Sequence, residues 1–254
     1  MVIYQCEDSL ESIFTAVYKA YEEKRNHCDT EICLDEEPRL FAEYVKVDAD
    51  VSKAVKVMRT LEGQFGEEDY LWLCYALASE AEDKAQAVYQ TIVDGLKRKV
   101  FRNHLFDNLA CTYVNRAFGL ARAVSRECQH LKGFVRFQEL ESGILYSEIT
   151  PKNNILTFLM PHFADRFPME NFMIYDSSRG ILGLHPAGKQ WYLVEGSENP
   201  KMAEGFILSN KEREYEELFR CFCRKICIEE RTNLKLQRNM LPLRFRENMV
   251  EFHH

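Results

Sequence analysis

The segment GFVRFQELESGILYSEIT, residues 133–150, is where the sequence changes from helical to strand periodicity. Before it, from Val51 to about Leu131, apolar residues recur at helical spacing. Within it, GFVRFQEL and ILYSEIT alternate in polarity and are separated by ESG, which predicts a β-hairpin. Helices and strands are therefore expected to be partly segregated along the chain, as in the α+β class.

The residues before this segment predict a small β element and a block of helices. VIYQCE (2–7) is typical of a short strand, and Asp8 or Ser9 can cap the helix that follows. RLFAEYVKVD (39–48) predicts a second strand, paired with the first. The helical block that begins at Val51 is expected to break near Gly63, at GQFGEED.

The residues after this segment predict one more helix within a mainly antiparallel sheet. Thr150 and Pro151 suit the start of a helix, NNILTFLMPHFADRF, in which Pro161 predicts a kink or a division. Three strands are expected next, and a final helix from about Lys211 to Glu230; the strands are NFMIYD, ILGLHP and QWYLVE. We expect one α+β domain over 1–254, or two lobes at 1–131 and 132–254.

Charge is distributed unevenly along the chain, whose formal net charge is −7. Residues 1–83 carry 20 acidic and 8 basic groups, whereas 84–138 carry 3 acidic and 10 basic groups. The overall charge disfavours nucleic acid, but the second segment leaves room for a basic surface. No apolar run is long enough to span a membrane and the N-terminus lacks the pattern of a signal peptide, so we expect a cytoplasmic protein that does not bind membranes.

The cysteines and histidines predict no metal or cofactor site. Nine cysteines in a chain of this length do not indicate a disulfide framework, and CFCRKIC (221–227) has helical periodicity that points its thiols in different directions. Phosphate-loop, dinucleotide, nucleophile-elbow, iron–sulfur and zinc-deaminase motifs are absent from the sequence. The terminal pair His253–His254 is given no metal role.

Two segments, 126–167 and 212–252, together resemble the bacterial family labelled probable DNA metabolism proteins, a domain otherwise of unknown function. The resemblance begins with Tyr4 and the first helix and so extends over the whole chain. The residues that carry it are Arg126, His130, Lys132, Phe134, Arg136, Phe137, Pro151, His162, Phe163, Arg166, Phe167, Arg231, Asn233, Gln237, Arg238, Pro242, Arg244 and Phe245. Where the family often has tryptophan, this chain has Tyr146, Phe172, Phe219 and Arg246.

The resemblance implies a role in DNA metabolism or repair by association. Members of that family are encoded beside a radical-SAM protein assigned to DNA modification or repair, and in some bacteria the domain is joined to a uracil-DNA glycosylase-like domain. We therefore expect a DNA-repair accessory or nucleic-acid-binding protein that acts with such a partner. Two alternatives remain open: an enzyme acting on a damaged base or nucleotide, and a scaffold that binds a protein partner.

The expected nucleic-acid contacts are arginines and a lysine, since an arginine fork pairs with phosphate and stacks on planar rings. They are Arg126, Lys132, Arg136, Arg166, Arg231, Arg238 and Arg244. His130 and His162 are the catalytic candidates if the protein is an enzyme.

Each candidate also has a structural alternative. Arg136 can pair with a sheet carboxylate such as Glu148, and His130 can close its helix. His162 and Arg166 share a helix face and can be a packing pair. The basic run Lys97–Arg102 can be a solvated helix end. Asp176 with Arg179 is expected to shape a turn.

The C-terminal segment is expected to pack back on the domain rather than to form a loose basic arm. Pro242 should stop any helix that runs through Met240. Leu241, Leu243 and Phe245 supply apolar anchors that would hold some of the arginines inward.

Overall fold

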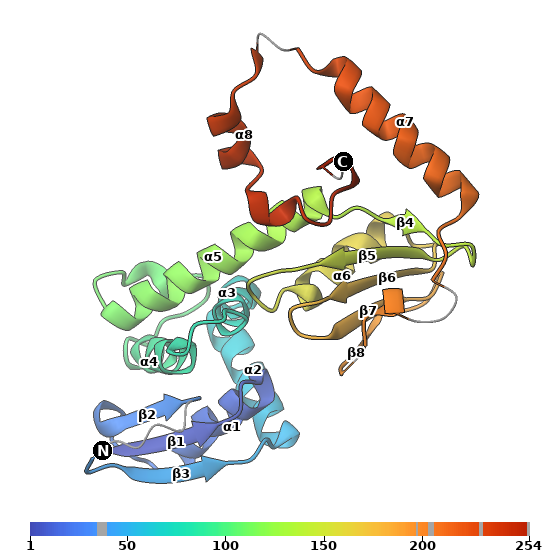
Figure 1. Cartoon of the computed structure of the whole chain (residues 1–254). Helices are drawn as coiled ribbons and strands as arrows, with labels where there is room; N and C mark the ends of the chain where they lie inside the picture. Colours follow the sequence, from blue (N-terminus) through green and yellow to red (C-terminus); the bar gives the residue numbers. More distant parts are fainter. Residues whose placement is uncertain (35–39, 197, 203–205, 229–230, 253–254) are drawn as a thin grey trace. The chain divides into compact units, whose positions relative to one another are not determined.

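The computed structural model describes residues 1–34, 40–196, 198–202, 206–228 and 231–252. The chain forms two compact units, Met1–Arg126 and Glu127–His254. The fold is α+β, as expected, with a parallel sheet in the first unit and a mixed sheet in the second (Figure 1). His253 and His254 lie outside the described residues, so their assignment stays a prediction.

A three-stranded parallel sheet opens the first unit, in the order β2-β1-β3. Its strands are β1 (Val2–Cys6), β2 (Thr30–Cys33) and β3 (Glu43–Val47). Parallel neighbours need a crossover, which α1 (Leu10–Glu22) provides between β1 and β2. The Ser9 hydroxyl caps α1. β3 corresponds to the second predicted strand, and its predicted pairing with β1 is confirmed.

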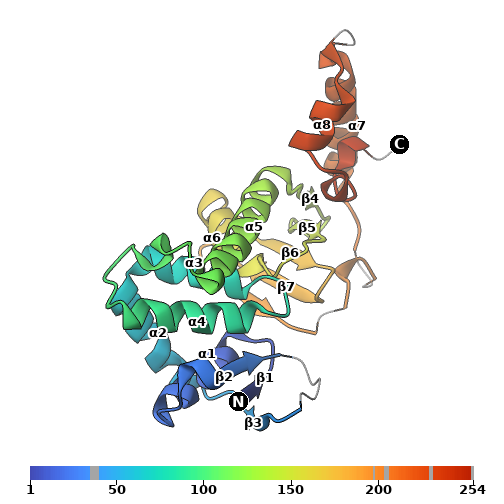
Figure 2. The same cartoon turned by 90° about the vertical axis from the view of Figure 1, so that its left-hand side faces the viewer.

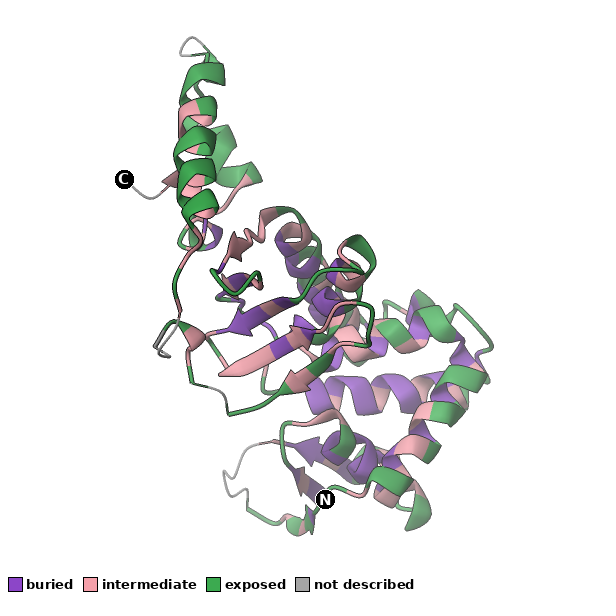
Figure 3. Ribbon diagram, turned by 90° about the vertical axis from the view of Figure 1, so that its right-hand side faces the viewer, coloured by how far each residue is buried: buried purple, intermediate pink, exposed green. Residues whose placement is uncertain are grey.

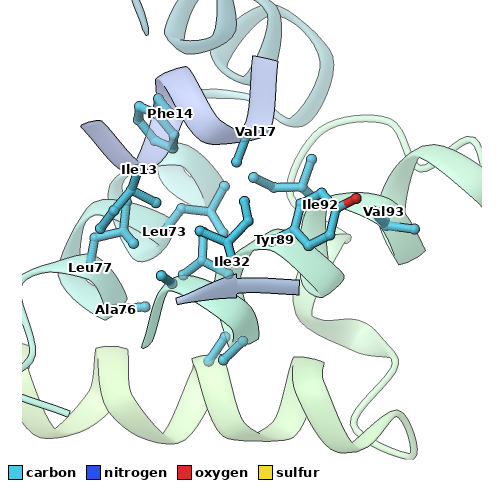
Figure 4. Packing of buried hydrophobic residues seen from close by; sticks show 14 of the residues in the cluster. Ile13, Phe14, Val17, Ile32, Leu73, Ala76, Leu77, Tyr89, Ile92 and Val93 are labelled. Carbon is cyan, nitrogen blue, oxygen red and sulfur yellow. The ribbon is translucent and has the colours of Figure 1, made fainter. Parts of the chain in front are cut away.

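The helical block packs around the core of the first unit. Its helices are α2 (Val51–Phe65), α3 (Glu67–Leu77), α4 (Lys84–Lys97) and the first part of α5 (Thr112–Phe134), with short 3₁₀ turns at His27–Asp29 and Leu105–Asp107. Side chains from α1, β2, α3 and α4 meet in this core (Figure 4). The predicted break falls at Gly66, whose φ of 87° suits glycine.

The second unit contains a five-stranded sheet in the order β4-β5-β6-β7-β8. Its strands are β4 (Gln138–Glu139), β5 (Leu145–Ile149), β6 (Phe172–Asp176), β7 (Ile181–His185) and β8 (Tyr192–Val194). The pairs β4–β5, β6–β7 and β7–β8 are antiparallel. The pair β5–β6 is parallel, because α6 (Leu156–Arg166) carries the chain back between them.

Residues 133–150 form a much shorter hairpin than the alternation predicted. The helix α5 continues through Phe134, where the Val135 amide still donates to the Leu131 carbonyl at 3.0 Å. The residues of FVRF therefore precede the strand, and only Gln138 and Glu139 pair with β5. The alternating residues of FVRF form the end of a helix and a connecting segment instead of a strand.

The helix expected after Thr150 and Pro151 begins later and does not divide. Its first residue is Leu156, so Thr150 and Pro151 are not its cap. Pro161 lies within α6, which is continuous from Leu156 to Arg166. The buried residues Leu156, Leu159, Met160 and Phe163 hold it against the sheet side of the unit, which offsets the hydrogen bond that proline cannot donate.

The C-terminal part of the second unit begins with the 3₁₀ turn Pro200–Met202 and then α7 (Asn210–Ile226) and α8 (Leu234–Met240). Short 3₁₀ turns follow at Leu243–Phe245 and Val250–Phe252. Neither α7 nor α8 has a buried residue, and both project beyond the sheet (Figures 2 and 3). The chain leaves α8 at Leu241, directly before Pro242, as predicted.

Candidate functional site

Lys132, His162 and Arg166 are brought together from two helices of the second unit. Lys132 lies in the last turn of α5, and His162 and Arg166 lie one turn apart on α6. The pKa of His162 is lowered, first by burial and then by the positive charges of Lys132 and Arg166, which outweigh the opposing effect of Asp165. His162 therefore favours its neutral form.

The charges of Lys132 and Arg166 are not neutralised by an ion pair with any residue that the structure describes. Arg166 is exposed and lies over the ring of Phe167, 5.6 Å from its centroid. The buried residues of α6 fix the helix, and His162 and Arg166 lie one turn apart on a flank of that buried face. We call Lys132, His162 and Arg166 the α5–α6 basic cluster. Its local field favours an anion.

His130 lies in an aromatic cluster, not with His162. Its ring centroid is 5.7 Å from that of Phe134 and 5.7 Å from that of Phe245. Phe245 is buried, and Arg244 lies over its ring at 4.6 Å. The contacts of His130 are those of a side chain that packs the C-terminal segment onto α5.

Glu127, on the same stretch of α5, is a buried carboxylate that sequence reasoning did not single out. It accepts hydrogen bonds from the amides of Lys152 and Asn153, both at 3.0 Å, and from Asn153 Nδ2 at 2.6 Å. Arg244 Nη2 lies 3.4 Å from Glu127 Oε1. The C-terminal segment packs back through Phe245, as expected, whereas Leu243 is exposed and Arg244 stays half exposed while it pairs with Glu127.

Asp176 and Arg179 shape the turn after β6, as predicted, and also hold the segment after β5. Asp176 Oδ1 accepts from the amide of Ser178 at 3.0 Å, and burial raises the pKa of its carboxyl group. Arg179 donates to the carbonyls of Pro151 at 3.3 Å and Lys152 at 2.6 Å. Residues 151–153 are therefore fixed from both sides, by Glu127 and by Arg179.

Arg136 makes a different ion pair from the one expected. Its guanidinium pairs with Glu251 at 2.8 Å, whereas Glu148 pairs with Lys201 at 2.7 Å. Arg136 precedes β4, so the expected position on a sheet face is wrong. It lies where a polar pocket of about 320 Å³ meets an apolar groove of about 620 Å³.

The remaining predicted nucleic-acid contacts are not part of the α5–α6 basic cluster. Arg126 is exposed on α5, and Arg231 and Arg238 are exposed before and within α8. In the basic segment of the first unit, Arg98 pairs with Asp94 at 2.6 Å and Arg116 with Asp83 at 2.7 Å. These two pairs use part of the positive charge that the sequence places there.

No metal site or membrane-spanning helix is found within the part of the chain that the structure describes. No three histidine, cysteine or acidic side chains there are grouped so that they could hold a metal ion. None of its helices is both long and apolar enough to cross a bilayer. Cys221 and Cys223 lie on α7, as the helical periodicity predicted, and Cys227 directly follows its last residue.

The fold and the site geometry define an α+β protein that has a mixed sheet and a basic cluster on two helices. Residues 82–251 match the family model described as "Domain of unknown function (DUF4130)". The chain belongs to that family, because the match covers more than half of it. Residues 1–81, including the N-terminal part of the resemblance described above, lie outside the matched range. No curated protein matches the sequence.

Proposed function

We propose that this protein binds nucleic acid in DNA metabolism or repair and acts with a radical-SAM or uracil-DNA glycosylase-type partner. The observation that carries the proposal is the α5–α6 basic cluster. Two cations there act on one half-buried histidine and outweigh the nearby carboxylate of Asp165. A phosphate oxygen would supply the missing negative charge.

Not all of the predicted arginines contribute equally to this proposal. Arg136 and Arg244 are engaged by Glu251 and Glu127, so their first role is to hold the C-terminal segment. Arg126, Arg231 and Arg238 are exposed and can add further phosphate contacts. The proposed partner rests on the sequence resemblance.

Binding to a DNA oligonucleotide over a range of salt concentrations tests the proposal. Each phosphate contact that is lost should reduce the slope of log K against log salt by about 0.9. We expect the double variant Lys132→Ala/Arg166→Ala to bind more weakly and to lower the slope by about two.

The matched control is Lys189→Ala/Arg213→Ala, which removes one exposed lysine and one exposed arginine elsewhere in the second unit. It should leave the slope nearly unchanged. Equal losses in both double variants would contradict the α5–α6 site. Failure of the unaltered protein to bind DNA at low salt, with or without its partner, would overturn the proposed function.

A further inference from the structure

An exposed apolar stripe runs along α7. Tyr215, Leu218, Phe219, Phe222 and Ile226 recur at helical spacing, and each side chain is between 39% and 65% exposed. A helix of this kind is normally held by burying its apolar face. In the described structure α7 buries none of its residues, so this stripe is a surface without an occupant.

Four residues of the stripe, Tyr215, Leu218, Phe219 and Phe222, form one wall of the apolar groove of about 620 Å³. Phe137 and Val250 line the groove beside Tyr215, Leu218 and Phe222. Figure 1 shows α7 and α8 splayed apart, and the exposed residues of both confirm that neither helix covers the other. The groove follows the stripe from Tyr215 to Phe222, and Ile226 continues the stripe beyond it.

The charges beside the stripe are self-complementary. Glu214 and Lys225 are eleven positions apart, so at 100° per residue they lie within about 20° of each other on one flank. Both are exposed, and neither forms an ion pair with a described residue. If two copies of α7 pack antiparallel about a point between Phe219 and Arg220, Glu214 of each copy lies opposite Lys225 of the other.

We propose that α7 is the interface of a two-fold symmetric homodimer in which the two copies of this helix pack antiparallel. A two-fold axis uses the same surface on both subunits, which requires the self-complementary pattern that α7 has. The stripe would fill the groove of the partner with aromatic and aliphatic side chains, and the Glu214–Lys225 pairs would fix the direction. This inference is independent of the proposed DNA binding.

Sedimentation equilibrium of the full chain, from low to high micromolar concentration, tests the dimer. Glu214→Lys and Lys225→Glu each place two like-charged pairs opposite one another, so each should weaken dimerisation by about tenfold. The combined variant Glu214→Lys/Lys225→Glu restores opposite charges and should restore the dimer. Glu217→Lys, an equal charge change on the opposite side of α7, should have little effect.

Phe222→Asp should give a monomer at every concentration while the circular dichroism spectrum stays unchanged, because Phe222 is 54% exposed in the single chain. A monomeric wild-type protein over the whole range would overturn the proposal. So would a dimer that is indifferent to both the charge exchange and Phe222→Asp. Loss of DNA binding by a monomeric Phe222→Asp variant, with no dimer in the wild type, would assign the groove to nucleic acid instead.

Discussion

Glu127 shows how one residue connects three segments of the second unit. It lies on α5, accepts from the backbone after β5 and holds Arg244 of the C-terminal segment. Its carboxylate is almost completely buried, so removing it leaves several polar groups without a partner. Arg244, in contrast, is half exposed and can turn to water.

Glu127→Ala should therefore destabilise the protein by about 3 kcal/mol. Arg244→Ala should cost less than about 1 kcal/mol, because an exposed partner in an ion pair contributes little. Urea denaturation of the two variants measures both values. Equal losses would mean that the ion pair, and not the backbone hydrogen bonds, gives Glu127 its importance.

The residue types of the site could be predicted from the sequence better than their partners. Arg244, His162 and Arg166 were singled out because they lie in the two segments that carry the family resemblance. Glu127 was not, since a lone glutamate on a long helix has no signal that distinguishes it from a solvated one. Arg136 was matched to Glu148, whereas Glu251, distant in sequence, is its partner.

At the scale of elements, α4 approaches its neighbours closely at one glycine. A Cβ atom at Gly95 would overlap the Leu105 side chain and lie 3.0 Å from two ring carbons of Phe65. Leu105 and Phe65 are both completely buried, so neither can move aside easily. Gly119 on α5, in contrast, has no atom within 4 Å of the same position.

Gly95→Ala should lower the free energy of unfolding by about 2 kcal/mol, because overpacking outweighs the better helix propensity of alanine. Gly119→Ala should raise it by up to about 1 kcal/mol. Thermal denaturation of the two variants, compared with the wild type, measures the difference. A stabilised Gly95→Ala variant would show that α4 does not pack on Phe65 and Leu105 as described.

Most elements with a clear apolar pattern were predicted correctly, including the short strands β1 and β8, whereas β2 and the extent of β4 were not. The helices α1, α4 and α7 and the strands β6 and β7 have clear apolar patterns and lie close to their expected positions. β2 was missed because its four residues follow a polar stretch and show no alternation. The extent of α5 and β4 was wrong because alternation over four residues fits a helix end as well as a strand.

At the scale of the whole molecule, the net charge conceals a local basic surface. The overall charge is −7, yet the positive charges of Lys132 and Arg166 act together on His162 in the second unit and lower its pKa. The sequence predicted the basic segment, but not that Arg98 and Arg116 form ion pairs while Lys132 forms none with a described residue. Such pairing depends on which helices meet, which the linear charge pattern does not contain.

The pKa of His162 depends on the charge of the α5–α6 basic cluster. The free protein should show a His162 pKa below its ordinary value of 6.5. The free energy of unfolding should therefore decrease as the pH falls below 6.5, because the unfolded chain takes up the proton first. Bound phosphate favours the protonated ring, so DNA should raise this pKa and bind more tightly as the pH falls.

An NMR titration of His162, assigned with a His162→Gln variant and recorded with and without a saturating DNA oligonucleotide, is the most direct measurement of this claim. We predict a depressed pKa in the free protein and a higher pKa in the complex, with the change reduced in Lys132→Ala/Arg166→Ala. A His162 pKa that is the same with and without bound DNA would contradict a phosphate site at the α5–α6 basic cluster.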